Sequence, residues 1–132
     1  MGVSHIGIAV KELKEAVKKY TVLLQRGPDE VVEVAEQQVR AAIFRMGDGS
    51  PSIELLEPLS GESPISKFLE KRGEGIHHIA ISVEDIEASL KRLKGEGCRL
   101  IDEKPRIGAE GHKIAFVHPA SFAGVLIELE EK

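Results

Sequence analysis

Two histidines and two glutamates occur at matching places in this chain, and their residue types suit metal binding. Glu54 follows His5 by 49 residues, and Glu128 follows His78 by 50. Each glutamate stands in the same tripeptide, Ile-Glu-Leu. Imidazole and carboxylate ligands favour a divalent ion such as Co, Mn, Ni, Mg or Zn over the soft metals that thiolates prefer. This paired pattern is more specific than a lone histidine, and it predicts a shared metal site.

Four protein ligands would leave two adjacent positions of a six-coordinate ion open. Two oxygens of one substrate could bind the ion at these positions. The ion would then polarise the substrate carbonyl and stabilise an enolate. The residues therefore indicate metal-assisted chemistry next to a carbonyl, and they leave the substrate open. The alternative for each glutamate alone is a solvated charge on the outer face of a sheet, and the matched histidines favour the site.

An internal repeat sets the positions of these four residues. SHIGIAV at 4–10 aligns with HHIAISV at 77–83, and a helical pattern follows each. Three β-type stretches come after each helix, at 30–34, 39–46 and 52–57 in the first half and at 98–102, 112–118 and 124–130 in the second. Each half therefore predicts the order β-α-β-β-β.

The repeat predicts an α+β fold with two β-α-β-β-β modules that form a cupped, mostly antiparallel sheet around a metal site. We expect residues 1–132 to form a single domain, with repeats at about 3–58 and 76–131. A linker helix is expected over about 63–72, because Ser63 suits the N-cap and Pro64 the first helical position. In the second module, Asp85 is the expected N-cap of the helix.

Strand alternation separates the adjacent histidines His77 and His78. Successive side chains of a strand point to opposite faces, so only one of the two can enter a given site. His78 shares its face with Ala80 and Ser82, whereas the branched residues of the strand line the other face. His5 likewise shares its face with small residues. We therefore predict that His78 is the ligand and that His77 is structural.

Composition excludes several classes of function. The chain has 132 residues, 42% of them hydrophobic and 30% charged, which is typical of a globular domain. The net charge of −4 argues against general nucleic-acid binding, and no apolar run reaches the roughly 20 residues that span a membrane. Cys98 is the only cysteine, so neither an intramolecular disulfide nor a thiolate cluster is expected, and a cytoplasmic location fits.

The duplicated pattern, with one histidine and one glutamate in each half, resembles the vicinal-oxygen-chelate superfamily, which includes glyoxalase I, bleomycin-resistance proteins and extradiol dioxygenases. Within it, the chain looks like the methylmalonyl-CoA epimerase family over nearly its whole length. SHIGIAV, IELLEP, KRGEGIHHIA and KPRIGAEGHKIAFVHP carry this resemblance.

The resemblance implies an enzyme that interconverts (2R)- and (2S)-methylmalonyl-CoA by removing and returning the C2 proton. It implies a divalent metal bound by His5, Glu54, His78 and Glu128, with Glu128 also acting as a catalytic base. An acyl-CoA would be the substrate, and the protein would form a homodimer. Several relatives have glutamine where Glu54 stands.

One departure from the family pattern concerns a second base. Some relatives have a glutamate two positions after an E-Q-G-V stretch, and Ala41 occupies that position here. A two-glutamate mechanism is therefore not transferred to this chain. A water or His112 is the candidate for the opposite face of the substrate. Three basic residues are candidates for the phosphates of CoA, namely Lys104, Arg106 and Lys113.

Other functions of the same superfamily remain open. A glyoxalase I acting on a glutathione hemithioacetal could use an identical ligand set. An extradiol dioxygenase is less favoured because it uses two histidines and one carboxylate in a longer chain. A non-enzymatic drug-binding module is disfavoured because such modules generally lack the full ligand set. The linker helix and the KPRIGAEGHK loop favour the epimerase.

Overall fold

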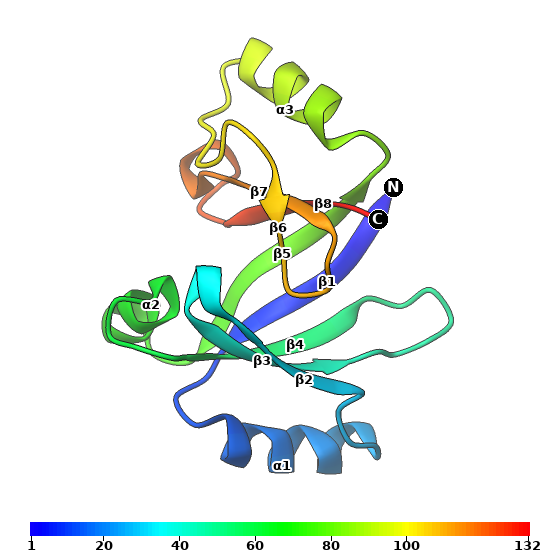
Figure 1. Ribbon diagram of the computed structural model, residues 1–132, viewed down its shortest axis with the longest axis vertical. Helices are drawn as coiled ribbons and strands as arrows, with labels where there is room; N and C mark the ends of the chain where they lie inside the picture. The colour runs from blue at the N-terminus through cyan, green and yellow to red at the C-terminus, as the bar shows by residue number, and fades with distance from the viewer. The chain divides into compact units, whose positions relative to one another are not determined.

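The computed structural model describes residues 1–132, with three α-helices, eight strands and two short 3-10 helices (Figure 1). In chain order these are β1 (Gly2–Ala9), α1 (Leu13–Leu24), β2 (Glu30–Val34), η1 (Ala35–Gln37), β3 (Val39–Phe44), β4 (Ser52–Pro58), α2 (Pro64–Arg72), β5 (Gly75–Val83), α3 (Ile86–Gly95), β6 (Arg106–Ile107), β7 (Lys113–Val117), η2 (Pro119–Ser121) and β8 (Ile127–Glu131). The predicted order β-α-β-β-β thus occurs twice, with α2 between the two copies.

The chain divides into two compact units whose boundaries fall inside β1 and β5. Unit 1 comprises Met1–His5 and His78–Lys132, and unit 2 comprises Ile6–His77. The predicted organisation of residues 1–132 as one domain stays a prediction, and each unit is described by itself.

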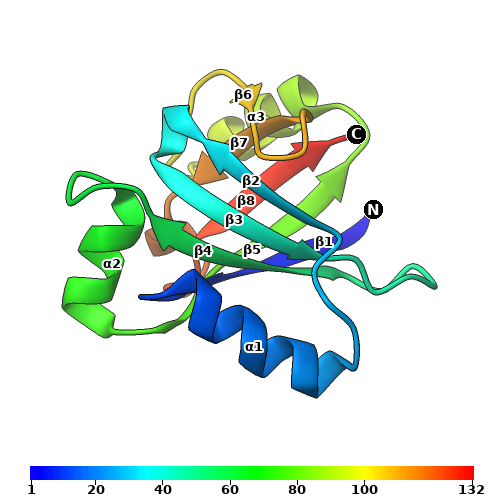
Figure 2. The ribbon, with the colours of Figure 1, turned by 60° about the horizontal axis from the view of Figure 1, so that its bottom comes forward.

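Unit 2 places α1 and α2 on opposite faces of β3 and β4. Strands β2, β3 and β4 pair antiparallel in sequence order. Alternation sends Ala42 and Leu55 into a buried cluster with the side chains of α1, which runs along these strands in Figure 2. The neighbouring Ala41 and Leu56 join a second cluster with Ile65 of α2. Both faces of the strand that carries Glu54 therefore contribute residues to a buried cluster within this unit.

Unit 1 covers one face of its strands with α3 (Figure 1). Strand β8 lies between β5, to which it runs parallel, and β7, to which it runs antiparallel. Ile86 and Leu90 of α3 pack into one buried cluster with Val83, Val117 and Leu129 from the strands. The residues that alternate with these strand positions lie on the other face, and they include His78 and Glu128.

Side chains at the predicted N-caps begin two of the helices. Ser63 Oγ accepts a hydrogen bond from the Ile65 N–H at 3.2 Å, one position after Pro64. Asp85 accepts one from the Ala88 N–H at 3.0 Å. Both N-cap predictions are confirmed, because a short polar side chain can satisfy an N–H that the first turn leaves without a partner.

The predicted strand at residues 98–102 is wrong. Only Leu100 forms a bridge there, to Val117, and the short strand β6 at Arg106–Ile107 pairs with β7 instead. The side chain of Asp102 accepts a hydrogen bond from the Phe116 N–H at 2.8 Å. This carboxylate takes the place of a backbone carbonyl, so the main chain leaves the ladder before Pro105, which has no N–H to donate.

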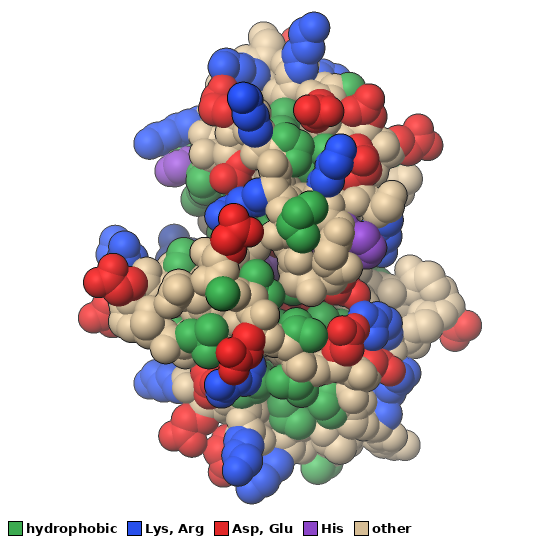
Figure 3. Space-filling view, viewed as in Figure 1, with side chains coloured by type: hydrophobic (Ala, Val, Ile, Leu, Met, Phe, Trp, Pro, Cys, Tyr) green, Lys and Arg blue, Asp and Glu red, His purple; other side chains and the backbone are tan.

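The surface over α3 carries both signs of charge. In Figure 3, Lys and Arg side chains alternate with Asp and Glu side chains over this helix and the loops beside it. No single-sign patch forms on that part of the face shown. None of the helices has the length and apolar character needed to cross a membrane.

Candidate active site

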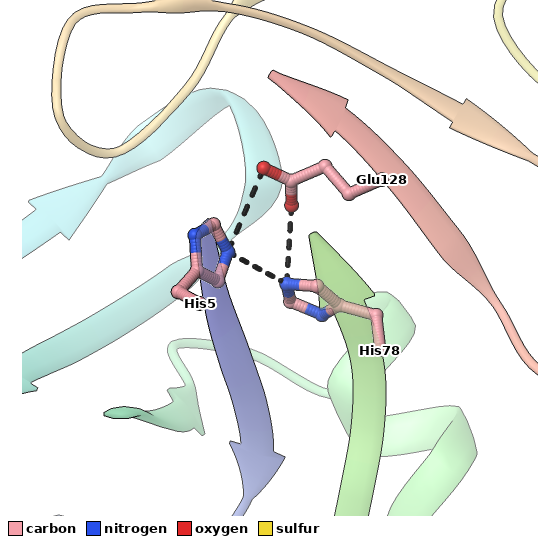
Figure 4. Close-up of side chains that lie close together, drawn as sticks. All are labelled: His5, His78 and Glu128. Atoms are coloured by element: carbon pink, nitrogen blue, oxygen red, sulfur yellow. Dashed lines mark hydrogen bonds and ion pairs between the residues drawn. The ribbon is translucent and has the colours of Figure 1, made fainter. Parts of the chain in front are cut away.

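Three of the four predicted ligands converge in unit 1. His5 comes from β1, His78 from β5 and Glu128 from β8, and their side chains point toward one another in Figure 4. All three are buried, with exposed fractions of 3%, 4% and 5%. Polar groups this deeply buried need partners, and here they are one another's partners.

Strand register explains why Glu128 reaches His78. Glu128 pairs with Ala80 of the parallel strand β5, and His78 stands two residues before Ala80. Residues two apart on a strand share a face, so His78 and Glu128 are diagonal neighbours on one side of the sheet. Phe116 of β7 pairs with Glu128 from the other side, and its ring meets the His78 ring edge-on at 5.6 Å between centroids.

The distances between the three groups fit a metal ion. The Nε2 atoms of His5 and His78 lie 3.1 Å apart, His78 Nε2 lies 3.1 Å from Glu128 Oε1, and His5 Nε2 lies 3.6 Å from Glu128 Oε2. Ligands bonded at about 2.1 Å are about 3.0 Å apart at right angles and about 3.4 Å apart in a tetrahedron. A buried set of two imidazole nitrogens and one carboxylate oxygen thus has both the chemistry and the spacing that a divalent ion requires.

The histidines also set the charge state of Glu128. Burial raises the pKa of this carboxyl, but hydrogen bonds from His5 and His78 outweigh burial and lower its pKa to about 2. Glu128 is therefore ionised at neutral pH, the form that can bind a cation or accept a proton.

The fourth predicted ligand, Glu54, lies in unit 2. It is 3% exposed and stands on β4 opposite Ile43 of β3. Ala41 of β3 shares this face, because it stands two residues before Ile43. Ala41 is fully buried, so the position at which some relatives have a second glutamate lies on the Glu54 face. The role of Glu54 as a ligand stays a prediction.

His77 has surroundings that suit a structural role. Its ring lies edge-on to the ring of Phe68 on α2, with 5.0 Å between centroids. Another histidine, His118, accepts a hydrogen bond from the Ala120 N–H at 3.0 Å and so caps the short helix η2.

The candidate CoA-binding residues have different surroundings. Arg106 lies over the ring of Phe116, with its Cζ 5.6 Å from the ring centroid, and its Nε is 3.6 Å from Asp102 Oδ1. Arg106 and His78 therefore both contact the ring of Phe116. Lys104 and Lys113 are exposed, and contact of these three residues with CoA stays a prediction.

Sequence reasoning missed Glu130, which is buried beside the site. Its carboxylate is 2% exposed and contacts Ser4, His5 and His112. The signal was present, because Glu130 follows Glu128 by two residues on one strand and must share its face. The sequence analysis placed Glu128 on that face and did not consider Glu130.

A family model described as the glyoxalase/bleomycin resistance protein/dioxygenase superfamily matches residues 4–116. The chain belongs to this superfamily. The resemblance inferred from SHIGIAV and the later motifs is therefore confirmed.

Within the superfamily, the chain is similar to methylmalonyl-CoA epimerases. The mitochondrial methylmalonyl-CoA epimerase of Dictyostelium discoideum is 42% identical over 130 residues, which cover 98% of this chain and 77% of that protein. The ethylmalonyl-CoA/methylmalonyl-CoA epimerase of Cereibacter sphaeroides is 40% identical over 130 residues, which cover 97% of this chain and 96% of that protein.

The chain is also similar to a methylmalonyl-CoA epimerase of known structure. A methylmalonyl-CoA epimerase in complex with methylmalonyl-CoA and NH4+ matches with a TM-score of 0.94 and 35% sequence identity, over 99% of this chain and 94% of that chain. The α+β class and the mostly antiparallel strand pairing are thereby confirmed as those of the superfamily.

Proposed function

We propose that this protein is a metal-dependent epimerase that interconverts (2R)- and (2S)-methylmalonyl-CoA. The observation that carries the proposal is the convergence of His5, His78 and Glu128 in a buried cluster. The cluster belongs to a chain whose relatives, matched over nearly the whole length of this chain, include named methylmalonyl-CoA epimerases.

His5, His78 and Glu128 would hold a divalent ion, and Glu54 is the proposed fourth ligand. When bound, such an ion supplies Lewis acidity toward the thioester carbonyl and makes the neighbouring C2 proton more acidic. The protein contributes a dry site, because all three side chains are almost fully buried, and electrostatic interactions are stronger where water is excluded.

Glu128 is the proposed base on one face of the substrate. In the metal-free protein its carboxylate is ionised at neutral pH, since its pKa is about 2. In the metal-loaded protein it would take the C2 proton to give an enolate. The opposite face needs a different group, because Ala41 stands where some relatives have a glutamate. Different groups would therefore remove or return the C2 proton on the two faces of the substrate. Glu128 would act on one face, and a water or His112 on the other.

Solvent exchange tests the proposal. The protein, loaded in turn with Co²⁺, Mn²⁺, Ni²⁺, Mg²⁺ or Zn²⁺, should incorporate deuterium at C2 of methylmalonyl-CoA in D2O while it interconverts the enantiomers. Treatment with a chelator should abolish both reactions, and returning the ion should restore them. Absence of deuterium incorporation with every ion would contradict the proposal, and full activity after chelation would contradict its metal dependence.

The same assay separates the alternative functions. A glyoxalase I would instead convert a glutathione hemithioacetal, and a non-enzymatic binder would exchange no proton. Because the relative from Cereibacter sphaeroides is named for two substrates, ethylmalonyl-CoA is the second substrate to include.

The cytoplasmic location stays a prediction, and fractionation of the source cells would check it.

A further inference from the structure

The carboxylate of Glu130 is buried beside His5 without being one of the proposed ligands. Only 2% of the residue is exposed. A buried carboxylate needs hydrogen-bond donors to offset its lost hydration. The hydrogen-bond donors around Glu130 therefore identify the groups with which its carboxylate interacts.

Each oxygen of Glu130 has its own partners. Oε1 accepts a hydrogen bond from Ser4 Oγ and lies 3.6 Å from Nδ1 of His5. Oε2 lies 3.0 Å from Nδ1 of His112, which is half-buried. The carboxylate is therefore held from both sides, with Oε1 placed next to the His5 ring.

The contact with His5 is made on the side of the ring that faces away from the ligand cluster. His5 presents Nε2 to His78 and Glu128. A neutral imidazole offers a lone pair on one nitrogen only when the proton is on the other. A carboxylate next to Nδ1 favours the proton there, which leaves the lone pair on Nε2 and increases its basicity.

We propose that Glu130 is a positioning residue that holds His5 in the Nδ1–H form, so that Nε2 can bind the ion, and that Ser4 and His112 fix Glu130 in place. This inference rests on the proposed metal site. Removing such an outer partner of a ligating histidine typically lowers metal affinity by about 10–100-fold.

A second carboxylate nearby provides a matched control. One oxygen of Glu110 lies within 4.8 Å of the ligand atoms of His5 and Glu130. A general effect of negative charge would act through Glu110 and Glu130 alike. A positioned acceptor would depend mainly on Glu130, because the contacts to Ser4 and His112 fix its orientation.

The first measurement is Zn²⁺ affinity, determined by competition with a chromophoric chelator in variants whose fold is checked by circular dichroism. Glu130→Gln keeps the size of the side chain and removes its charge, and it should weaken Zn²⁺ binding by about 10–100-fold. Glu130→Asp, which restores the charge on a shorter side chain, should recover part of the loss. Glu110→Gln should have a much smaller effect than Glu130→Gln.

The second measurement is the Nδ1–H proton of His5 in the Zn²⁺-loaded protein, followed by ¹H–¹⁵N NMR. In the wild type we expect a slowly exchanging resonance at low field. Glu130→Gln should move it upfield and speed its exchange, whereas a merely structural role would leave it unchanged.

Three outcomes would overturn the inference. One is wild-type Zn²⁺ affinity in Glu130→Gln, and another is an unchanged His5 resonance in that variant. The third is an equal loss of affinity in Glu110→Gln, which would mean that charge rather than position matters. A wild-type protein that binds none of the divalent ions would instead overturn the proposed metal site, and this inference with it.

Discussion

Glu131 Oε2 accepts a hydrogen bond from the backbone N–H of Ile86 at 2.9 Å, which ties β8 to the first turn of α3. The first module repeats this contact, because Glu57 Oε2 accepts one from the Leu13 N–H, at the start of α1, at 2.8 Å. In both modules the glutamate stands three residues after the glutamate of Ile-Glu-Leu. Each module therefore anchors its helix to the strand that carries its candidate ligand.

Removing either anchor should lower the free energy of unfolding. Glu131→Ala leaves the first N–H of α3 without its partner, which typically costs about 0.5–2 kcal/mol. Glu57→Ala should cost at least as much, because α1 has no N-cap side-chain bond of its own, whereas Asp85 also caps α3. Urea unfolding of both variants shows which one loses more unfolding free energy. A larger loss in Glu131→Ala than in Glu57→Ala would contradict the prediction.

The two adjacent histidines should respond differently to substitution. His78→Ala removes a nitrogen from the ligand cluster, so metal binding and turnover should both be lost. His77→Ala removes a ring that contacts Phe68 and leaves the ligand cluster intact, so the metal should stay bound while stability falls. Calorimetric titration with a divalent ion distinguishes the two, and loss of metal in His77→Ala alone would show that the face assignment is wrong.

Glu128→Gln separates metal binding from proton transfer. An amide oxygen can still bind a divalent ion, but the side chain can no longer act as a base near neutral pH. The variant should therefore keep its metal and its substrate, and lose epimerisation by about 10²–10⁴-fold.

The loss in this variant should also be unequal between enantiomers. Because Ala41 provides no second carboxylate, deuterium exchange should fall much more from one enantiomer than from the other. Equal losses would mean that one group limits both directions, and near-normal turnover would leave Glu128 only the role of a ligand.

Acid should destabilise the metal-free protein through Glu128. Burial raises the pKa of this group, but hydrogen bonds from the two histidines bring it to about 2, below its usual 4.5. A carboxyl with a lower pKa in the folded state stabilises that state above the unfolded pKa, and the stabilisation is lost as pH falls through the folded pKa. Chelator-treated wild type should thus lose unfolding free energy from pH 4.5 toward 2, and Glu128→Gln should lose less.

The measurement is urea unfolding at a series of pH values within that window. Glu128→Gln serves as the control for every other carboxyl in the chain. Equal losses in the two proteins would show that Glu128 does not contribute to the acid sensitivity.

Self-association should occur, with a homodimer as the expected assembly. In unit 2, the apolar residues Val22, Leu23 and Val31 are 80%, 69% and 54% exposed, and hydrophobic side chains gather near β2 and α1 in Figure 3. Exposed apolar groups and sheet edges favour association. Sedimentation velocity at micromolar concentration checks this, and a stable 14.4 kDa monomer would contradict it.

The sequence predicted the features that depend on local chemistry. Ser63 and Asp85 cap their helices because a short polar side chain can reach the nearby N–H groups. Strand alternation predicted which face of the sheet the His78 side chain occupies, and it placed the His77 side chain on the opposite face. Such features need only neighbouring residues, so one sequence is enough to infer them.

The features that failed depend on contacts between distant parts of the chain. Residues 98–102 have the composition of a strand, but Asp102 bonds to Phe116 and ends the pairing there. Glu130 stood on the predicted face, yet its importance depends on Ser4, which lies 126 residues away in the sequence. No periodicity in one chain reveals which distant partner a side chain will find.

Unit 1 begins with Met1–His5 and resumes only at His78, so the two repeats of the sequence are not the two compact parts of the molecule. A chain cut before His78 would separate the repeats but leave His5 and Ser4 on the other fragment. The second half, expressed alone, would then lack one candidate ligand and a partner of Glu130. Fragment complementation, rather than domain excision, is therefore the way to divide this protein without losing its site.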